Sequence, residues 1–472
     1  MADEPETITW SCWLRTVVAG ITALFTLAFV GLSDGTSNLL LSQLTKKDSL
    51  ISISQDQESW VASLGLLAAP IAAILIGPFI DFFGRKKGVL FFYLIMGIGW
   101  AVIGSARNVT QLCIGRIICS IGEGLQACAV VYLTEICATE QRSIVLAWLM
   151  ALLSAGILLV NVINTCVSWS TACLGFSLAA FAFAIAELFV PESPAWLFCQ
   201  GKEEAAVKNL QRLGRTQARV HMEIETLRQY KSSTESLSWR TFLKPTVWKP
   251  FVILAVFHVL QFSTGCDVII FYQVDFLTSL GTTYDPVLVS VALATVKFLS
   301  NITVGVYTKS ISRKLSTAIS GFCMTVPLAG AVIYECHYRN MPVLDRPVQW
   351  LLLTFIFAYQ VAAELAVTCL PWTMVGELYP LSVRGTMSGV TYFFAYCSYF
   401  AYVKFFFACL GVLKIYGILF VFAASSFLAG LFGICILPET HGKSLVEVEQ
   451  GFEGKTQEID KNVVVPLSPI NT

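Results

Sequence analysis

The chain has 472 residues, of which 56% are hydrophobic and 13% are charged, and its mean hydropathy is +0.70. Soluble domains contain about 45–50% apolar and about 25% charged residues, so this composition excludes a soluble globular protein and indicates an integral membrane protein. The formal net charge is zero, which gives no reason to expect a nucleic-acid partner. The fifteen cysteines form no CxxC motif. We therefore expect no metal site, disulfide framework or cofactor.

In chain order, residues 1–14 lack the features of a secretory signal peptide, and we expect them to be a cytoplasmic N-terminus. Apolar runs of about 20 residues, long enough to cross a membrane, then follow in two sets of six. The predicted spans lie near residues 15–40, 60–80, 88–105, 112–134, 144–167 and 171–190, and near 251–277, 287–308, 315–336, 348–376, 386–410 and 416–437. The sequence therefore predicts an all-α membrane protein with bundles at 15–190 and 251–437.

A polar linker and a polar tail complete the predicted organisation. Residues 191–250 alternate in charge, which predicts two or three short amphipathic helices, and residues 438–472 form a tail. Lysine and arginine concentrate in the linker and in loops on the same side of the predicted membrane. The positive-inside rule then makes both termini cytoplasmic. The sequon at Asn108 falls in an outside loop, where it can be glycosylated, whereas the sequon at Asn301 falls in a span.

Three charged motifs occur twice in the same order, once in each set of spans. Glu135-x6-Arg142 recurs as Glu377-x6-Arg384, GRKK at 84–87 recurs as SRK at 312–314, and VPES at 190–193 recurs as LPET at 437–440. This pattern indicates a tandem duplication. Because six spans return the chain to the side from which it started, the two copies form parallel repeats.

These motifs resemble those of the sugar porters of the major facilitator superfamily. The resemblance extends from the first span to Leu445 and rests on an ordered set of motifs. They are DFFGRK at 81–86, GRIICSIGEG at 115–124, YLTEI before Arg142, PESPAWL at 191–197, Phe271-Tyr272, Pro371-Trp372, GELYPLSVRG at 376–385 and PETHGKSL at 438–445. Within this superfamily the chain looks most similar to insect trehalose and glucose facilitators. The resemblance implies the twelve-helix major facilitator fold.

Charged residues at the predicted cytoplasmic ends of the spans suit an inner gate. Ion pairs that are partly removed from water are stronger than pairs in bulk water, and they can hold helix ends together in one conformation. The alternative is that they are solvated topology anchors, which accounts for the bases but not for the acids opposite them. The predicted inner-gate residues are Asp81, Arg85, Arg116, Glu135, Arg142, Glu192, Arg313, Lys314, Glu377, Arg384 and Glu439.

Polar residues deep in the seventh and eighth spans are candidates for the substrate site. Gln261 and Tyr272 share helical spacing and offer groups that suit sugar hydroxyls. The resemblance makes Gln261 the first of two sugar-binding glutamines, and Phe262 replaces the second. Asp267 and Lys297 stand where the family has asparagines. We expect these two charges to face each other across the cavity, or else to reach a water-filled vestibule separately.

The remaining candidates lie in spans one, five and ten. Gln360, Glu364 and Thr368 recur at helical spacing before Pro371-Trp372, and the resemblance places Glu364 and Trp372 in the cavity. Met150 and Ala395 stand where the family has a glutamine and an asparagine. In proton-coupled relatives a first-span aspartate lies beside the span-four arginine. Asp34 is therefore a candidate proton site, with the alternative that it only lines the outer vestibule.

The resulting prediction is a transporter and not an enzyme, because the four histidines form no cluster. We expect a hexose or a disaccharide such as trehalose to be its small-molecule partner. The lipid bilayer surrounds the chain, and we expect this to be the plasma membrane. We expect alternating access with facilitated diffusion. Two alternatives remain open: a proton-coupled symporter, which depends on Asp34, and a non-transporting sugar sensor, which the loss of polarity at Met150 and Ala395 favours.

Overall fold

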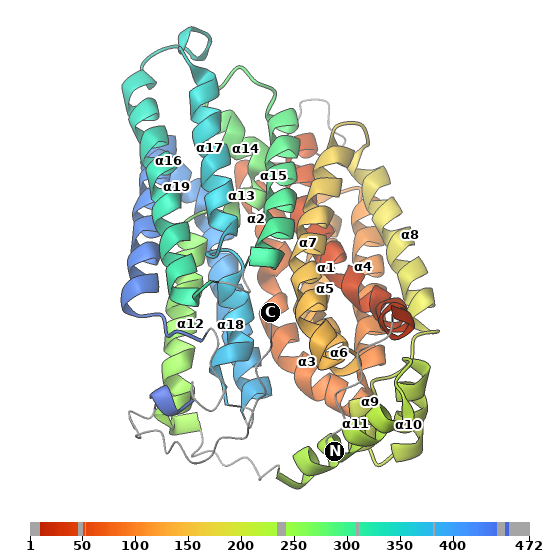
Figure 1. Cartoon of the computed structure of the whole chain (residues 1–472). Helices are drawn as coiled ribbons and strands as arrows, with labels where there is room; N and C mark the ends of the chain where they lie inside the picture. Colours follow the sequence, from red (N-terminus) through yellow and green to blue (C-terminus); the bar gives the residue numbers. More distant parts are fainter. Residues whose placement is uncertain are drawn as a thin grey trace.

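The structure is a computed structural model that describes residues 10–45, 51, 53–233, 242–307, 311–380, 383–440 and 449–452. Throughout these ranges the regular elements are helices (Figure 1). Nine helical stretches in this part of the chain are long and apolar enough to cross a membrane. Some of the predicted spans are built from shorter helices in tandem, and two are joined in one long helix. The predicted all-α membrane architecture is confirmed.

The first half contains six spans that pack around one apolar core. A cluster of aromatic rings lies within this core, with Phe29 in contact with both Tyr93 and Trp100. The spans are α1 (Trp10–Leu44), α2 (Gln55–Leu67) with α3 (Ala69–Phe83), α4 (Arg85–Gly104), α5 (Val109–Leu125) with α6 (Ala127–Ile136), α7 (Thr139–Asn164) and α8 (Trp169–Glu187).

Two glycines allow α1 and α7 to pack unusually closely. A Cβ atom on Gly31 would lie 1.9 Å from the carbonyl oxygen of Leu153, and one on Gly156 would lie 2.1 Å from that of Ala28. Small residues let the backbones of membrane helices approach, so that packing can hold them without a hydrophobic driving force. An alanine at either position would push the two helices apart.

The polar linker folds as three helices against one end of the first half (Figure 1). They are α9 (Pro194–Cys199), α10 (Glu203–Arg212) and α11 (Gln217–Ser233). The buried guanidinium of Arg215 joins them to the bundle, since it donates to the carbonyl oxygen of Ile136 at 3.0 Å and forms an ion pair with Glu223 at 3.1 Å. We call this end of the molecule the linker end and the other the opposite end.

The second half repeats the six-span pattern with more interruptions. Its elements are α12 (Pro245–Ser263), α13 (Val268–Phe271), α14 (Gln273–Ser279), α15 (Pro286–Tyr307), α16 (Arg313–Tyr338), the 3-10 helix η2 (Val343–Asp345), α17 (Gln349–Glu364), α18 (Leu370–Leu378) and α19 (Arg384–Cys435). The predicted spans eleven and twelve are both within α19. They are divided at Lys414, whose φ of 57° and ψ of 174° are not helical.

The seventh span is broken between α12 and α13, as the glycine in its sequence suggested. Gly265 has a φ of +84°, and a Cβ atom there would lie 2.2 Å from the ring of Phe422. Only glycine adopts this conformation without strain and also leaves room for the ring. The break interrupts the regular helical hydrogen bonding and brings Asp267, at the start of α13, close to the middle of the span.

Candidate functional site

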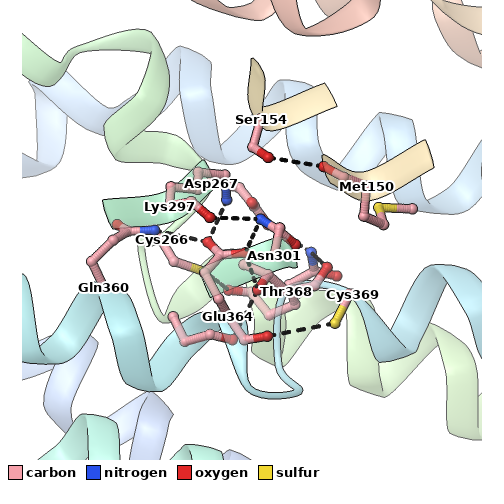
Figure 2. Close-up of polar contacts among 12 residues, drawn as sticks. Met150, Ser154, Cys266, Asp267, Lys297, Asn301, Gln360, Glu364, Thr368 and Cys369 are labelled. Carbon is pink, nitrogen blue, oxygen red and sulfur yellow. Dashed lines mark hydrogen bonds and ion pairs between the residues drawn. The ribbon is translucent and has the colours of Figure 1, made fainter. Parts of the chain in front are cut away.

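A buried ion pair lies in the interior of the second half. The ammonium Nζ of Lys297 on α15 lies 2.5 Å from Oε1 of Glu364 at the end of α17, and their side chains are 7% and 2% exposed (Figure 2). Three neutral groups also donate to this carboxylate: the amide of Gln360 at 2.8 Å, the amide of Asn301 at 3.0 Å and the hydroxyl of Thr368 at 3.1 Å. Each oxygen of Glu364 therefore accepts two hydrogen bonds. A buried ion pair is tolerated when its polar atoms are satisfied in this way.

The close ion pair of Lys297 is with Glu364 and not with Asp267, the partner that we predicted, although Lys297 and Asp267 still interact electrostatically. Asp267 lies beside this pair (Figure 2) and accepts a 2.6 Å hydrogen bond from the amide of Gln261 through Oδ2. The same amide nitrogen donates to the carbonyl oxygen of Thr368 at 3.1 Å. Gln261 thus links the break in the seventh span to the break between α17 and α18. Its carbonyl oxygen Oε1 is buried and has no hydrogen-bond partner among the residues that the structure describes.

Aromatic rings surround this polar cluster. Phe262 is buried and stacks on Tyr399 with ring centroids 4.6 Å apart. Trp372 on α18 is half-buried, with its ring 4.9 Å from that of His258 and 5.8 Å from that of Tyr392. Rings of this kind present flat apolar surfaces beside polar groups, an arrangement typical of small-molecule sites.

Tyr272 was predicted to bind substrate, but its contacts are those of a packing residue. The side chain is fully buried, and its hydroxyl donates to the carbonyl oxygen of Val403 at 2.9 Å. Its ring stacks on Phe406 with centroids 5.0 Å apart. The hydroxyl is already used, so Tyr272 fixes α13 and α14 against α19 and does not offer a free group to a sugar.

Arg116 was predicted among the inner-gate residues, and this placement was wrong. Its side chain is fully buried in the first half, where the guanidinium donates to the backbone oxygens of Ser33, Val61 and Ala62 and to the hydroxyl of Ser37. Arg116 follows the start of α5 by two turns, and that start is at the opposite end of the molecule from the linker helices. It holds α1, α2 and α5 together in the interior.

Asp34 and Met150 lie in the first half. Asp34 is buried on α1, next to Ser33, whose backbone carbonyl accepts a hydrogen bond from Arg116 and whose hydroxyl donates to Glu123. The Asp34 carboxylate forms no ion pair with Arg116 in the part of the chain that the structure describes. Met150 is half-buried on α7, where its carbonyl oxygen accepts from the hydroxyl of Ser154 (Figure 2). Met150 brings no polar side-chain group to the site.

The first cluster of predicted gate charges assembles at the linker end, within the first half. Arg85 forms ion pairs with Asp81 at 2.9 Å and with Glu135 at 3.0 Å, and Glu135 also accepts from the hydroxyl of Ser193. Glu192 accepts from the backbone N–H of Arg85 at 3.0 Å, at the start of α4. The N-terminus of a helix favours a negative charge, so this carboxylate fixes the turn between α3 and α4.

The second half carries a matching cluster. Arg313 lies 2.9 Å from Glu377, and Glu377 also accepts from the hydroxyl of Thr440. The carboxylate of Glu439 accepts from the backbone N–H groups of Arg313 and Lys314 at the start of α16. The side chains of Arg142 and Arg384, which we predicted to join these clusters, lie outside the described residues. Each cluster joins helices of one half, so the pairs described do not cross between the halves.

Side-chain hydrogen bonds between the halves are found at the centre and toward the opposite end. Near the centre, Gln126 donates to the hydroxyl of Tyr396. Asn38 on α1 accepts from the backbone N–H of Val274 at 3.0 Å. Lys404 on α19 donates to Ser59 of α2 at 2.7 Å, and its ammonium lies 3.7 Å from the ring centroid of Trp60. No reading of the sequence pointed to these contacts, although a lysine inside the apolar eleventh span was a signal for Lys404.

Asn108, the predicted glycosylation site, is exposed just before α5. Its side-chain oxygen accepts from the backbone N–H of Gln111 at 2.9 Å and so caps the helix. The side-chain nitrogen, the atom to which a glycan would be attached, is not used in this cap.

Two similar halves of apolar spans, with a polar cluster buried inside the second, are the architecture of a multi-pass membrane protein of the major facilitator type. The family model for "Sugar (and other) transporter" matches residues 18–452, and the chain belongs to this family. It is an integral membrane sugar transporter and not an enzyme.

Curated relatives agree with this assignment. The facilitated trehalose transporter Tret1 of Apis mellifera ligustica is 27% identical over 430 residues, which cover 89% of this chain and 85% of that protein. Tret1 of Culex quinquefasciatus is 27% identical over 479 residues, covering 100% and 91%. Tret1 of Drosophila mojavensis is 28% identical across 99% of this chain, which spans only 54% of that longer relative.

Solved structures show the same fold. The proton:xylose symporter XylE bound to 6-bromo-6-deoxy-D-glucose aligns with a TM-score of 0.71 at 19% identity, over 93% of this chain and 99% of that one. The partially occluded inward-open xylose transporter from E. coli gives a TM-score of 0.71 at 19% identity, over 92% and 100%. This likeness confirms the predicted twelve-helix fold.

Proposed function

We propose that the chain is a facilitative carrier for a neutral sugar, a hexose or a disaccharide such as trehalose, and that it works by alternating access. The observation that supports this most directly is the polar cluster around Gln261 and Asp267 at the break in the seventh span. It lies beside a row of rings that runs from Tyr399 and Phe262 through His258 to Trp372. Sugar hydroxyls both donate and accept hydrogen bonds, and sugar faces stack on aromatic rings. The insect relatives are named as trehalose transporters, and we propose trehalose as one candidate substrate of this chain.

The proposed substrate contacts fall to three residues. Gln261 and Asp267 supply the polar groups, and Trp372 supplies the ring. Lys297 and Glu364 are engaged with each other, so we assign them to the support of the site. Phe262 and Met150 contribute apolar surface, and the hydroxyl of Tyr272 is engaged with the backbone.

The proposed transport cycle depends on rigid halves that move against each other. The two proposed halves are residues 15–190 and 251–437. The clusters around Arg85 and Arg313 support this cycle, because each cluster stiffens the linker end of one half. The contacts of Asn38 and Lys404 support a closed arrangement at the opposite end. We assign the linker end and both chain termini to the cytoplasm, in keeping with the positive-inside rule, and the chain to the plasma membrane with Asn108 outside.

Radiolabelled sugar uptake into proteoliposomes tests the proposal. Purified protein should take up at least one of glucose and trehalose faster than protein-free vesicles. Unlabelled sugar loaded inside should accelerate the uptake, because a carrier returns faster when it is loaded than when it is empty. Binding of sugar without any uptake would identify a sensor and contradict the proposal. Trp372→Ala should weaken uptake, whereas Trp10→Ala, an exposed tryptophan far from the site, serves as the matched control.

A further inference from the structure

We propose that Asp267 sets the charge preference of the sugar site: its carboxylate admits neutral or cationic sugars, such as amino sugars, and rejects anionic sugars such as uronates and sugar phosphates. This inference rests on the proposed function and names the substrate class more narrowly. The geometry of the Lys297–Glu364 pair points to this inference. The pair occupies the ammonium of Lys297, so the charged group that remains accessible to a substrate is the carboxylate of Asp267.

Lys297 is the cation nearest to this part of the site, and it is committed to Glu364. The 2.5 Å contact and the three neutral donors around Glu364 leave a pair whose charges cancel. Both side chains are almost completely buried. An anionic substrate would therefore have to break this pair to reach the ammonium of Lys297, and it would leave a buried carboxylate without its counter-ion.

Asp267 is a second carboxylate near the single ammonium of Lys297, so the three groups together keep one net negative charge when all are ionised. Unlike its buried neighbours Gln261, Lys297 and Glu364, Asp267 is only half-buried. Gln261 donates to Oδ2 at 2.6 Å, and this is the hydrogen bond that the side chain makes within the described part of the chain. An ionised carboxylate only accepts hydrogen bonds, so Oδ1 is available to a substrate hydroxyl or ammonium group.

The position of Asp267 aims this charge at the interface between the halves. It lies at the start of α13, and α13 packs against α1 of the other half. Asp34 on α1 also interacts electrostatically with Asp267, but it interacts more strongly with Arg116, which offsets its charge, so Asp267 is the carboxylate that decides the charge on this side of the interface. A solute between the halves thus meets a field that opposes negative charge. Coulomb repulsion between two like charges is several times stronger in a partly desolvated site than in water.

Competition among three sugars that differ in charge tests the inference. Glucose, glucosamine and glucuronate compete with labelled sugar uptake, and they are also tested for binding by thermal shift of the purified protein. The pH is chosen so that the amine is protonated and the acid is ionised. Glucuronate should compete roughly tenfold less well than glucose, which corresponds to about 1.4 kcal/mol, and glucosamine should compete at least as well as glucose.

In Asp267→Asn the three sugars should compete with labelled sugar uptake to within about twofold of one another, because the substitution keeps the shape of the side chain and removes its charge. Asp267→Glu should keep the order. Asp275→Asn, which removes a carboxylate from α14 of the same span, should also keep it. Equal competition by glucuronate and glucose in the native protein would overturn the inference, even if Asp267→Asn failed to fold, and so would an unchanged order in Asp267→Asn.

The two proposals fail in different ways. Uptake without charge discrimination overturns only the inference about Asp267. Charge-ordered binding without uptake overturns only the proposed carrier activity. Absence of both binding and uptake for all three sugars and for trehalose overturns both.

Discussion

Lys297 and Glu364 stabilise the second half only as a pair. Lys297→Met would remove the ammonium and leave a carboxylate that is 2% exposed with no counter-ion. Breaking a buried ion pair in this way costs about 3–5 kcal/mol. We expect a markedly lower melting temperature in detergent and less protein at the membrane, both measurable by fluorescence-detected size-exclusion chromatography.

The matched control is the double variant Lys297→Met/Glu364→Gln. It removes both charges, its new amide oxygen can still accept from Asn301 and Thr368, and a flipped Gln360 amide can accept from the new NH2 group, so it should recover most of the lost stability. A Lys297→Met protein as stable as the native one would show that the pair contributes nothing. A double variant no better than the single one would show that Lys297 acts through packing.

The difference between sequence and structure is clearest at these residues. Gln360 and Glu364 could be placed on one face of α17 from their spacing, whereas Thr368 lies in the turn after that helix and still reaches Glu364. The break at Gly265 was visible as a glycine among polar residues. The partner of Lys297 could not be predicted, because periodicity within a span does not say which neighbouring span it faces. For the same reason we predicted Arg116 at the inner gate. In the structure its guanidinium donates to backbone oxygens of α1 and α2.

At the scale of whole elements, the cluster around Arg85 ties α4 to α6 and to the turn after α8. Its two acidic partners differ in exposure: the side chain of Glu135 is 19% exposed and that of Asp81 is 71% exposed. Glu135→Gln should therefore lower the free energy of unfolding by about 2 kcal/mol, in the range for a hydrogen bond to a charged group. Asp81→Asn should cost less than about 0.5 kcal/mol, because an exposed ion pair contributes little.

Thermal unfolding of the two variants side by side measures this difference. Both substitutions remove one of the two carboxylates that pair with Arg85. The general effect of losing one acidic partner is therefore the same in both variants. Equal losses would mean that burial of Glu135 and its contact with Ser193 add nothing to the pair. A larger loss for Asp81→Asn would contradict the assignment of Glu135 as the main partner.

The order of the spans could be predicted with more success than their ends and interruptions. Apolar runs of sufficient length are a property of the sequence alone, and each predicted run coincides with helix in the described part of the chain. The tenth span is divided into α17 and α18 just before Pro371. This proline explains the division, because it has no N–H group with which to continue the hydrogen bonding of a helix. The joining of the last two spans in α19 had no such signal, since it depends on the backbone conformation of Lys414, a single exposed residue.

At the scale of the whole molecule, Lys404 connects the two halves at the opposite end from the linker. Its ammonium donates to Ser59 and lies over the ring of Trp60, and a cation over an aromatic face contributes about 0.5–2 kcal/mol. Lys404→Met should therefore loosen this end. A cysteine placed at the buried Leu41 should then react faster with an impermeant maleimide applied from outside. Phe405→Ala, at the exposed position next to Lys404 on the same helix, should leave the rate unchanged.

The interior charges of the first half also bear on the energetics of transport. Arg116 donates to three backbone oxygens and to Ser37, and none of these hydrogen bonds goes to the Asp34 carboxylate. Within the described part of the chain, protonation of Asp34 therefore breaks no direct hydrogen-bonded contact with Arg116, and it weakens only the longer-range attraction between the two charges. We expect uptake to stop when the internal sugar concentration equals the external one, and a protonophore to have no effect. Asp34→Asn should keep uptake within about twofold of the native rate, a difference of about 0.4 kcal/mol. Accumulation above the external concentration that is lost both with a protonophore and in Asp34→Asn would identify a symporter instead.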